Sequence, residues 1–173
     1  MSNRVRCRWG APIGARMGGA FWTKVALPLL LGVLCLGQQG SDAWPQSALL
    51  KPAALASVLQ SSTARRPIIL CVAFPMLYNA RHIPHAVFAG PASRPAGIEA
   101  LKKAVAGLAK DSDIAIYCGC CPMFECPNLG PAFRTLREMG FTRVRVLEIP
   151  TNMYTDWYAK NYPSEPGSAA GGR

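Results

Sequence analysis

Of the 173 residues, 50% are hydrophobic and 16% are charged, and this composition supports one hydrophobic core. Two full-sized domains are excluded, because a domain usually takes roughly 100 to 200 residues. Residues 44–173 hold 14 of the 19 basic and 8 of the 9 acidic residues, so they keep a net charge of +6 out of the chain's +10. These bases are dispersed, without interleaved aromatic residues, which argues against binding of nucleic acid.

The first 43 residues have the pattern of a secretory signal. Basic residues, with no acidic residue among them, precede the apolar run 25–37, which is shorter than the ~20 residues needed to cross a bilayer. Small residues then suit cleavage before Trp44. We therefore expect a signal peptide over residues 1–43 and a periplasmic or secreted domain over residues 44–162. An uncleaved membrane anchor is the alternative, and we expect contact with a membrane only in that case.

Helical spacing and apolar runs alternate along the first half of the domain. The patterns predict a helix from Pro52 to Leu59, a strand over 67–73 that is buried on both faces, a shorter strand over 86–89, and a helix with Ile98, Leu101, Val105 and Leu108 on one face.

The second half continues the alternation. The patterns predict a strand over 113–117, a helix from about Asn128 to Gly140, a strand over 143–147, a closing helix over 153–160, and a disordered tail over 163–173. Strands that alternate with helices indicate an α/β fold with a mainly parallel sheet, whose ligands bind at the carboxyl ends of the strands. Cys118 lies at such an end.

Four segments resemble the rhodanese family in their order and spacing. They are Ile69 to Val72, Tyr78 to Ala86 with Arg81-His82-Ile83-Pro84, Ile114 to Cys118, and Leu136 to Val144 with the pair Gly140-Phe141. The resemblance spans about residues 47 to 162. It implies a rhodanese-like α/β fold, in which helices flank a central, mainly parallel sheet. It also implies that Cys118 is the catalytic nucleophile and holds sulfur as a persulfide.

The loop that follows Cys118 is the predicted substrate-binding segment. Amides around Gly119 and Cys120 are expected to cradle an anionic sulfur or an oxyanion, and a low pKa is expected for Cys118 from these amides and the next helix N-terminus. Substrate binding is assigned to Gly119, Cys120, Cys121, Pro122 and Met123. The loop is longer than the family norm and indicates an exported subgroup with a Cys-Gly-Cys-Cys-Pro and Cys-Pro-Asn pattern.

Several roles remain open for the other cysteines. Cys121, Cys126 and Cys71 are the candidates for a resolving thiol or a disulfide. A structural disulfide from Cys120 or Cys121 to Cys126 competes with reversible pairing to Cys118. Four thiolates also suit a soft metal, although their spacing is crowded for zinc. We assign no metal ligand and expect no cofactor.

The sequence therefore predicts an exported sulfurtransferase, similar to thiosulfate sulfurtransferases, or a thiol oxidoreductase. Its partner is expected to be a small sulfur-containing substrate or a thiol protein. A noncatalytic module, whose cysteine loop binds a soft metal or forms a disulfide-stapled binding surface, is the alternative. His82 is expected to be structural within its turn, and Trp157 to close the core.

Overall fold

A computed structural model describes residues 44–167 of the chain. The predicted signal peptide and the last six residues of the predicted tail, 168–173, lie outside the described residues. Within residues 44–167, no helix has the length and the apolar character needed to span a membrane.

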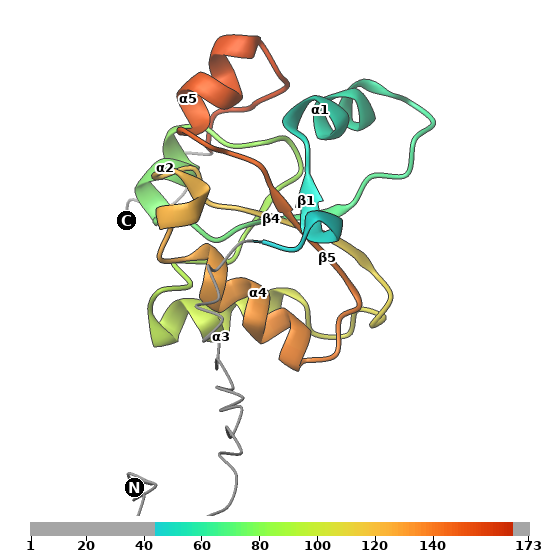
Figure 1. The fold of residues 1–173 in the computed structure, drawn as a ribbon, viewed down its shortest axis with the longest axis vertical. Helices are drawn as coiled ribbons and strands as arrows, with labels where there is room; N and C mark the ends of the chain where they lie inside the picture. The colour runs from blue at the N-terminus through green and yellow to red at the C-terminus, as the bar shows by residue number, and fades with distance from the viewer. Residues whose placement is uncertain (1–43, 168–173) are drawn as a thin grey trace, which may run out of the picture. The chain divides into compact units, whose positions relative to one another are not determined.

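The centre of the domain is a five-stranded sheet in which every pair of neighbours is parallel (Figure 1). In chain order the strands are β1 (Leu49–Leu50), β2 (Ile68–Cys71), β3 (Val87–Phe88), β4 (Asp113–Tyr117) and β5 (Arg143–Leu147). Their order across the sheet is β1-β5-β4-β2-β3. The predicted α/β fold with a mainly parallel sheet is confirmed.

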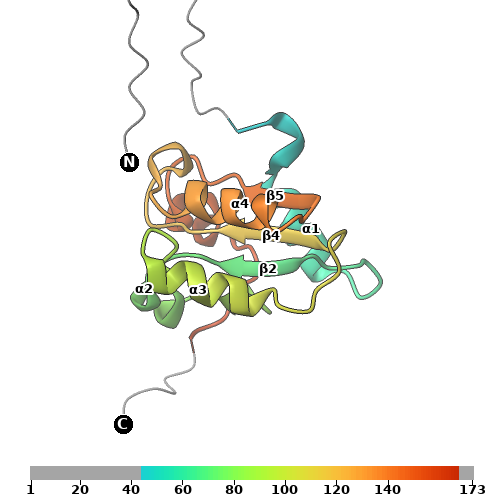
Figure 2. The ribbon, with the colours of Figure 1, turned by 90° about the horizontal axis from the view of Figure 1, so that it is seen from below.

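Helices cover both faces of this sheet. They are α1 (Pro52–Gln60), α2 (Pro75–Ala80), α3 (Pro95–Ala104), α4 (Leu129–Glu138) and α5 (Met153–Asp156), with 3-10 turns η1 (Gln46–Ala48), η2 (Met123–Glu125) and η3 (Tyr158–Lys160). Figures 1 and 2 show α3 and α4 side by side on one face, with α1 and α5 on the other. The first three helices begin at proline, whose fixed φ suits the first helical position and whose missing N–H is not needed there.

Strand β2 is buried on both faces, as its continuous apolar run predicts. Leu70 of β2, Ile116 of β4 and Val146 of β5 occupy one row across the sheet, and none has exposed surface. Burial of a large apolar side chain contributes roughly 1.5 to 3 kcal/mol each. This layer therefore provides much of the core that supports the carboxyl edge of the sheet.

Two predicted helices differ from the structure, and one helix was not predicted. The closing helix breaks at Trp157 into α5 and η3, because Trp157 leaves helical backbone angles and donates its indole N–H to the Pro163 oxygen at 2.9 Å. The third helix ends at Ala104, before the predicted Leu108. Helix α2 was not predicted, because none of its six residues is fully buried and it therefore lacks an apolar periodicity.

The structure also differs from the prediction at the start of the tail, which was predicted to be disordered. Residues 163–167 lie against the domain, where the backbones of Glu165 and His82 exchange two hydrogen bonds of 2.9 Å. The Glu165 carboxylate lies 3.2 Å from His82 Nε2. Sequence composition did not indicate this pairing, because it joins residues that are far apart in the chain.

Truncation of the central layer tests this description of the core. We expect Leu70→Ala to lower the free energy of unfolding by about 2 to 5 kcal/mol, because it opens a cavity between two helical layers. Met76→Ala, at a side chain that is 76% exposed on α2, is the matched control and should change it by about 0.5 kcal/mol or less. Urea unfolding under reducing conditions measures both. Equal effects of the two substitutions would contradict the burial of β2.

Candidate functional site

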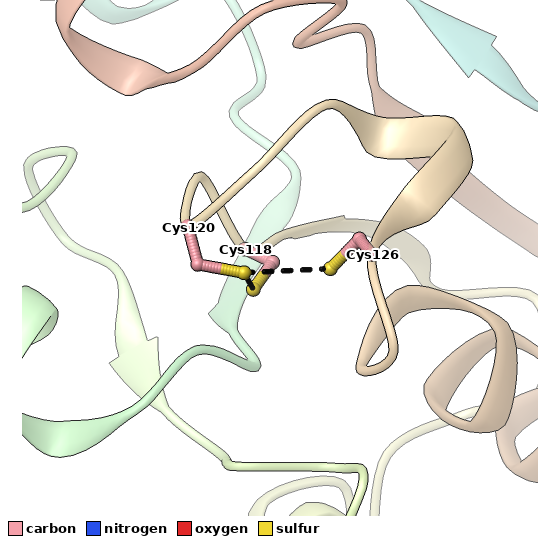
Figure 3. A group of neighbouring side chains, drawn as sticks. All are labelled: Cys118, Cys120 and Cys126. Carbon is pink, nitrogen blue, oxygen red and sulfur yellow. Dashed lines mark hydrogen bonds between the residues drawn. The ribbon is translucent and has the colours of Figure 1, made fainter.

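The cysteine loop leaves the sheet at the carboxyl end of β4 and leads into α4. Cys118 follows the last residue of β4 directly, in the place that the sequence predicts. Figure 3 shows the side chains of Cys118, Cys120 and Cys126 pointing toward one another. The three sulfur atoms lie within 4.8 Å of one another, and we call them the sulfur cluster. The loop therefore gathers thiols that are eight residues apart in sequence.

Short distances join the sulfur atoms of the loop. Cys120 Sγ lies 3.2 Å from Cys118 Sγ and 3.9 Å from Cys126 Sγ. Cys121 Sγ lies 3.0 Å from Cys120 Sγ but is not part of the cluster. All five cysteines of residues 44–167 are free thiols in this structure. The structure thus places Cys120 between the other two members of the cluster.

Gly119 allows the chain reversal that brings Cys120 back to Cys118. Its φ is +77°, in the left-handed region that other residues adopt with strain. A Cβ atom at Gly119 would lie 2.0 Å from Met153 Cγ. Met153 is itself buried, and its N–H donates to the Gly119 oxygen at 3.5 Å. The first turn of the loop is therefore packed against the start of α5.

A second segment, residues 149–156, holds the loop from the other side. The N–H of Met123 donates to the Ile149 oxygen at 2.9 Å. The buried Asp156 carboxylate accepts the N–H groups of Thr151 at 2.6 Å and Asn152 at 3.1 Å. Sequence reasoning assigned no role to Asp156 in this site, although Asn152 four residues before it is typical of a helix N-cap. This segment supports the loop in one conformation.

Cys126 is the thiol whose environment favours the thiolate. Its pKa falls from 9.0 to about 6, first through its interaction with the neighbouring Cys118 thiol. Burial opposes this effect, while the N–H groups of Asn128 and Leu129 and the Cys120 thiol strengthen it. These two N–H groups belong to the beginning of α4, where the helix dipole is positive. Cys126 therefore holds negative charge near neutral pH.

The pKa of Cys118 is raised well above its ordinary value, which differs from the expectation of a low pKa. The largest cause is the interaction with the neighbouring Cys126 side chain, and burial adds to it, since only 3% of Cys118 is exposed. The Cys120 N–H acts in the opposite direction. The physical reason is that the N-terminal N–H groups of α4 face Cys126 and not Cys118. Cys118 therefore keeps its proton, whereas Cys126 loses its own near neutral pH.

Asn128 connects the sulfur cluster to the loop before α3. Its Nδ2 donates to Cys118 Sγ at 3.3 Å, and its Oδ1 accepts the Ser93 N–H at 2.9 Å. The residue has no exposed surface. Sequence reasoning identified Asn128 only as the approximate start of a helix. The signal available was an amide side chain two residues after a loop cysteine, and its partners are decided by the fold.

Two cavities reach the cluster from different sides. One of about 110 Å³ is lined by Cys71, Arg81, Cys118 and Tyr158, and another of about 320 Å³ is lined by Cys126, Phe124 and Arg134. A larger cavity, of about 480 Å³, lies by Asp113 and Arg143 at the opposite ends of β4 and β5 and has no cysteine in its lining. The 110 Å³ and 320 Å³ cavities are the candidate substrate sites, because each is lined by a cysteine of the sulfur cluster.

The other predicted site residues in the loop and in β2 lie outside the sulfur cluster. Cys71 lines the 110 Å³ cavity, and burial raises its pKa to about 11. Burial also raises the pKa of Cys121 above its ordinary value. Pro122 precedes η2, and the side chain of Met123 is buried beside the 320 Å³ cavity. The cluster itself contains the predicted nucleophile Cys118, Cys120 of the predicted substrate-binding segment, and Cys126.

The two residues predicted to be structural have structural environments. His82 is buried, its Nδ1 lies 2.9 Å from the Tyr78 oxygen, and its ring stacks on Tyr78 with centroids 4.0 Å apart. Trp157 is fully buried in the core. Both roles predicted from the sequence are confirmed.

A substitution at Gly119 tests how the loop is held. We expect Gly119→Ala to lower the free energy of unfolding by about 3 kcal/mol or more, because left-handed strain adds to a clash with Met153. Gly107→Ala is the matched control: its φ is +81°, but a Cβ there meets nothing within 4 Å. Gly107→Ala should lower the free energy of unfolding by only about 1 kcal/mol, which is the cost of the left-handed strain alone. Chemical denaturation compares the two variants, and equal losses would contradict the packing of Met153 on the loop.

The titration of Cys126 provides a second test. A lowered pKa means that the thiolate is present above about pH 6 and is lost as the pH falls through that value. We expect the ultraviolet absorbance of thiolate in the reduced protein to rise with a midpoint near pH 6. The Cys126→Ser variant should lack this step, whereas Cys121→Ser should retain it. A first thiolate that forms only near pH 9 would contradict the assignment.

Comparison with known proteins gives matches among solved structures alone. No family model and no curated protein matches the sequence. The crystal structure of the Alr3790 protein from Anabaena sp. is 23% identical with a TM-score of 0.54, and the match covers 70% of this chain and 95% of that chain. The BH2092 protein from Bacillus halodurans is 22% identical with a TM-score of 0.54, over 69% and 77%.

The rhodanese-like domain of the Alr3790 protein, determined in solution, is 25% identical with a TM-score of 0.50. This match covers 73% of this chain and 86% of that chain. The parallel sheet, the flanking helices and the cysteine that follows β4 agree with the resemblance found in the sequence. The described domain is thus a rhodanese-like domain in its fold.

Proposed function

We propose that the protein transfers sulfane sulfur through a persulfide on Cys118, with the Cys126 thiolate as the proton acceptor. One observation carries this proposal: the Sγ atoms of Cys118 and Cys126 lie within 4.8 Å of each other at the carboxyl end of β4, where the pKa of Cys118 is raised and that of Cys126 is lowered. A thiol that can pass its proton to a neighbour becomes a nucleophile without a low pKa of its own. The rhodanese-like fold supports the same assignment.

The first step uses a small anionic donor that carries a sulfane sulfur, such as thiosulfate. Cys118 Sγ attacks the outer sulfur of the donor while its proton moves to Cys126. A sulfur–sulfur bond forms at Cys118, and the bond between the outer sulfur and the rest of the donor breaks. The leaving group takes the electron pair, and with thiosulfate it is sulfite. Cys118 then carries a persulfide.

The surroundings of Cys118 suit an anionic substrate and product. The Cys120 N–H and Asn128 Nδ2 both donate toward Cys118, and N–H donors stabilise anionic sulfur. Arg81 lines the cavity next to Cys118, where its guanidinium lies 4.5 Å from the ring of Tyr158 and donates to Ser164 Oγ at 2.7 Å. This cation supports the attraction of an anionic donor into the 110 Å³ cavity.

The persulfide can be removed from Cys118 by two routes. An acceptor thiolate can attack the terminal sulfur of the persulfide, which transfers the sulfur and restores Cys118. Alternatively, the Cys120 thiolate, 3.2 Å from Cys118 Sγ, can attack the inner sulfur, which forms a disulfide and releases hydrosulfide. The second route oxidises two thiols and reduces the sulfane sulfur, and a thiol partner protein must then reduce the disulfide. Sulfur transfer and thiol redox chemistry thus share one intermediate.

Export of the domain is part of the proposal. The basic and apolar segments of residues 1–43 support it, because they have the pattern of a signal peptide. An oxidising compartment outside the cytoplasm favours chemistry that alternates between persulfide, disulfide and thiol. A periplasmic or secreted thiol protein is the partner class that fits this setting.

Sulfur loading tests the proposed function. We expect the reduced protein to gain the mass of one sulfur atom after incubation with thiosulfate, with the added sulfur on Cys118. The Cys118→Ser variant should gain none, and Cys121→Ser should load normally. Intact-mass and peptide-mass spectrometry measure both results.

The role of Cys126 has a separate readout in the same assay. Cys126→Ser should still load, but about 100-fold more slowly at neutral pH, because general base assistance is typically worth ~10²-fold or more. Its loading rate should recover as the pH rises, since hydroxide then deprotonates Cys118. Sulfur that stays bound in Cys118→Ser, or no loading from any sulfane donor, would overturn the proposed function.

A further inference from the structure

We propose that the sulfur cluster of Cys118, Cys120 and Cys126 is a three-coordinate binding site for one Cu(I) ion. The inference depends on the positions of three sulfur atoms and not on the sulfur-transfer reaction. Each residue contributes one Sγ, and the three side chains converge from two ends of the same loop (Figure 3). Sulfur loading uses Cys118 and Cys126, whereas the metal site also requires Cys120.

The distances match those of a trigonal metal site. With metal–sulfur bonds of about 2.3 Å, three sulfurs around one ion lie about 4 Å apart. In this structure Cys120 Sγ is 3.2 Å from Cys118 Sγ and 3.9 Å from Cys126 Sγ, and all three separations are at most 4.8 Å. Shifts of about 1 Å or less would bring the three sulfurs to the separations of a trigonal site.

The donor set selects the class of metal. Thiolate sulfur is a soft ligand that favours Cu(I), zinc and iron–sulfur clusters over magnesium, calcium or manganese. Structural zinc sites and iron–sulfur clusters take four protein ligands. Among residues 44–167, no histidine, aspartate or glutamate joins the group. Cys121 Sγ lies 3.0 Å from Cys120 Sγ, but it is not within 4.8 Å of all three sulfurs of the cluster. Three mutually close sulfurs fit Cu(I), which accepts low coordination numbers.

The surroundings compensate the charge of such a site. Three thiolates and one Cu(I) carry two net negative charges. The Cys120 N–H and Asn128 Nδ2 donate to Cys118, and the N–H groups of Asn128 and Leu129 donate to Cys126. These last two lie at the positive end of α4. Donors of this kind around metal ligands hold their orientation and strengthen binding.

Burial suits a metal that must be shielded from water. Cys118 is 3% exposed and Cys126 is 9% exposed, whereas Cys120 is partly exposed. The ion would therefore enter past Cys120 and reach two buried thiols. Because Cu(I) and a persulfide both occupy Cys118, the metal-bound protein does not load sulfur.

Anaerobic titration with Cu(I) tests the inference. The experiment uses the reduced full chain with Cys7→Ser and Cys35→Ser, which removes the thiols outside the domain, and a chromogenic Cu(I) chelator as competitor. We expect one Cu(I) per chain. Cys118→Ser, Cys120→Ser and Cys126→Ser should each weaken binding about 10-fold or more, because each removes a ligand. The control variants Cys121→Ser and Cys71→Ser should bind as tightly as the parent.

X-ray absorption and sulfur loading give independent readouts. Copper absorption spectra should show a shell of three sulfurs. The Cys120→Ser variant should lose Cu(I) affinity yet still load sulfur on Cys118, which separates failure of this inference from failure of the proposed function. A two-sulfur or four-sulfur shell, or an equal loss of affinity in Cys121→Ser, would overturn the three-coordinate site. Unfolding of each metal-free variant in urea shows whether the domain remains folded.

Discussion

The left-handed turn at Gly119 is the constraint on which the rest of the site depends. It comes directly after β4 and folds the chain back beneath Met153, so that Cys120 meets Cys118 at 3.2 Å. A residue with a Cβ atom would strain this turn and displace Met153. The turn also starts the path of the loop through η2, which returns Cys126 to the same place. One backbone conformation thus brings together three thiols.

Electrostatics then divides the roles of these thiols. The N-terminal N–H groups of α4 face Cys126 and favour its thiolate, while the neighbouring Cys126 side chain and burial raise the pKa of Cys118. Asn128 contacts Cys118 and Ser93, so it ties the position of the donor to the opposite loop. A rhodanese-like fold supports many arrangements at this edge of the sheet. The chemistry proposed here comes from the loop and its hydrogen bonds.

The two proposals draw on the same property of the cluster. Soft, close and partly buried sulfur atoms are suited both to sulfur–sulfur bond exchange and to Cu(I). They differ in the residues that they need: sulfur loading needs Cys118 and a base, whereas the trigonal metal site needs all three thiols. Since both use Cys118, occupancy by one excludes the other. The redox state and the metal supply would then decide which form the protein takes.

Local patterns in the sequence were sufficient for the scaffold and for the first residue of the site. The apolar run of β2 and the proline at the start of α1 are signals within a few residues, and Cys118 follows β4 because its position is set by that strand. The thiolate on Cys126, the bond from Asn128 and the packing of residues 163–167 were decided only by the tertiary structure. Each depends on hydrogen bonds between groups brought together by the fold, and a pattern of neighbouring residues does not contain that information.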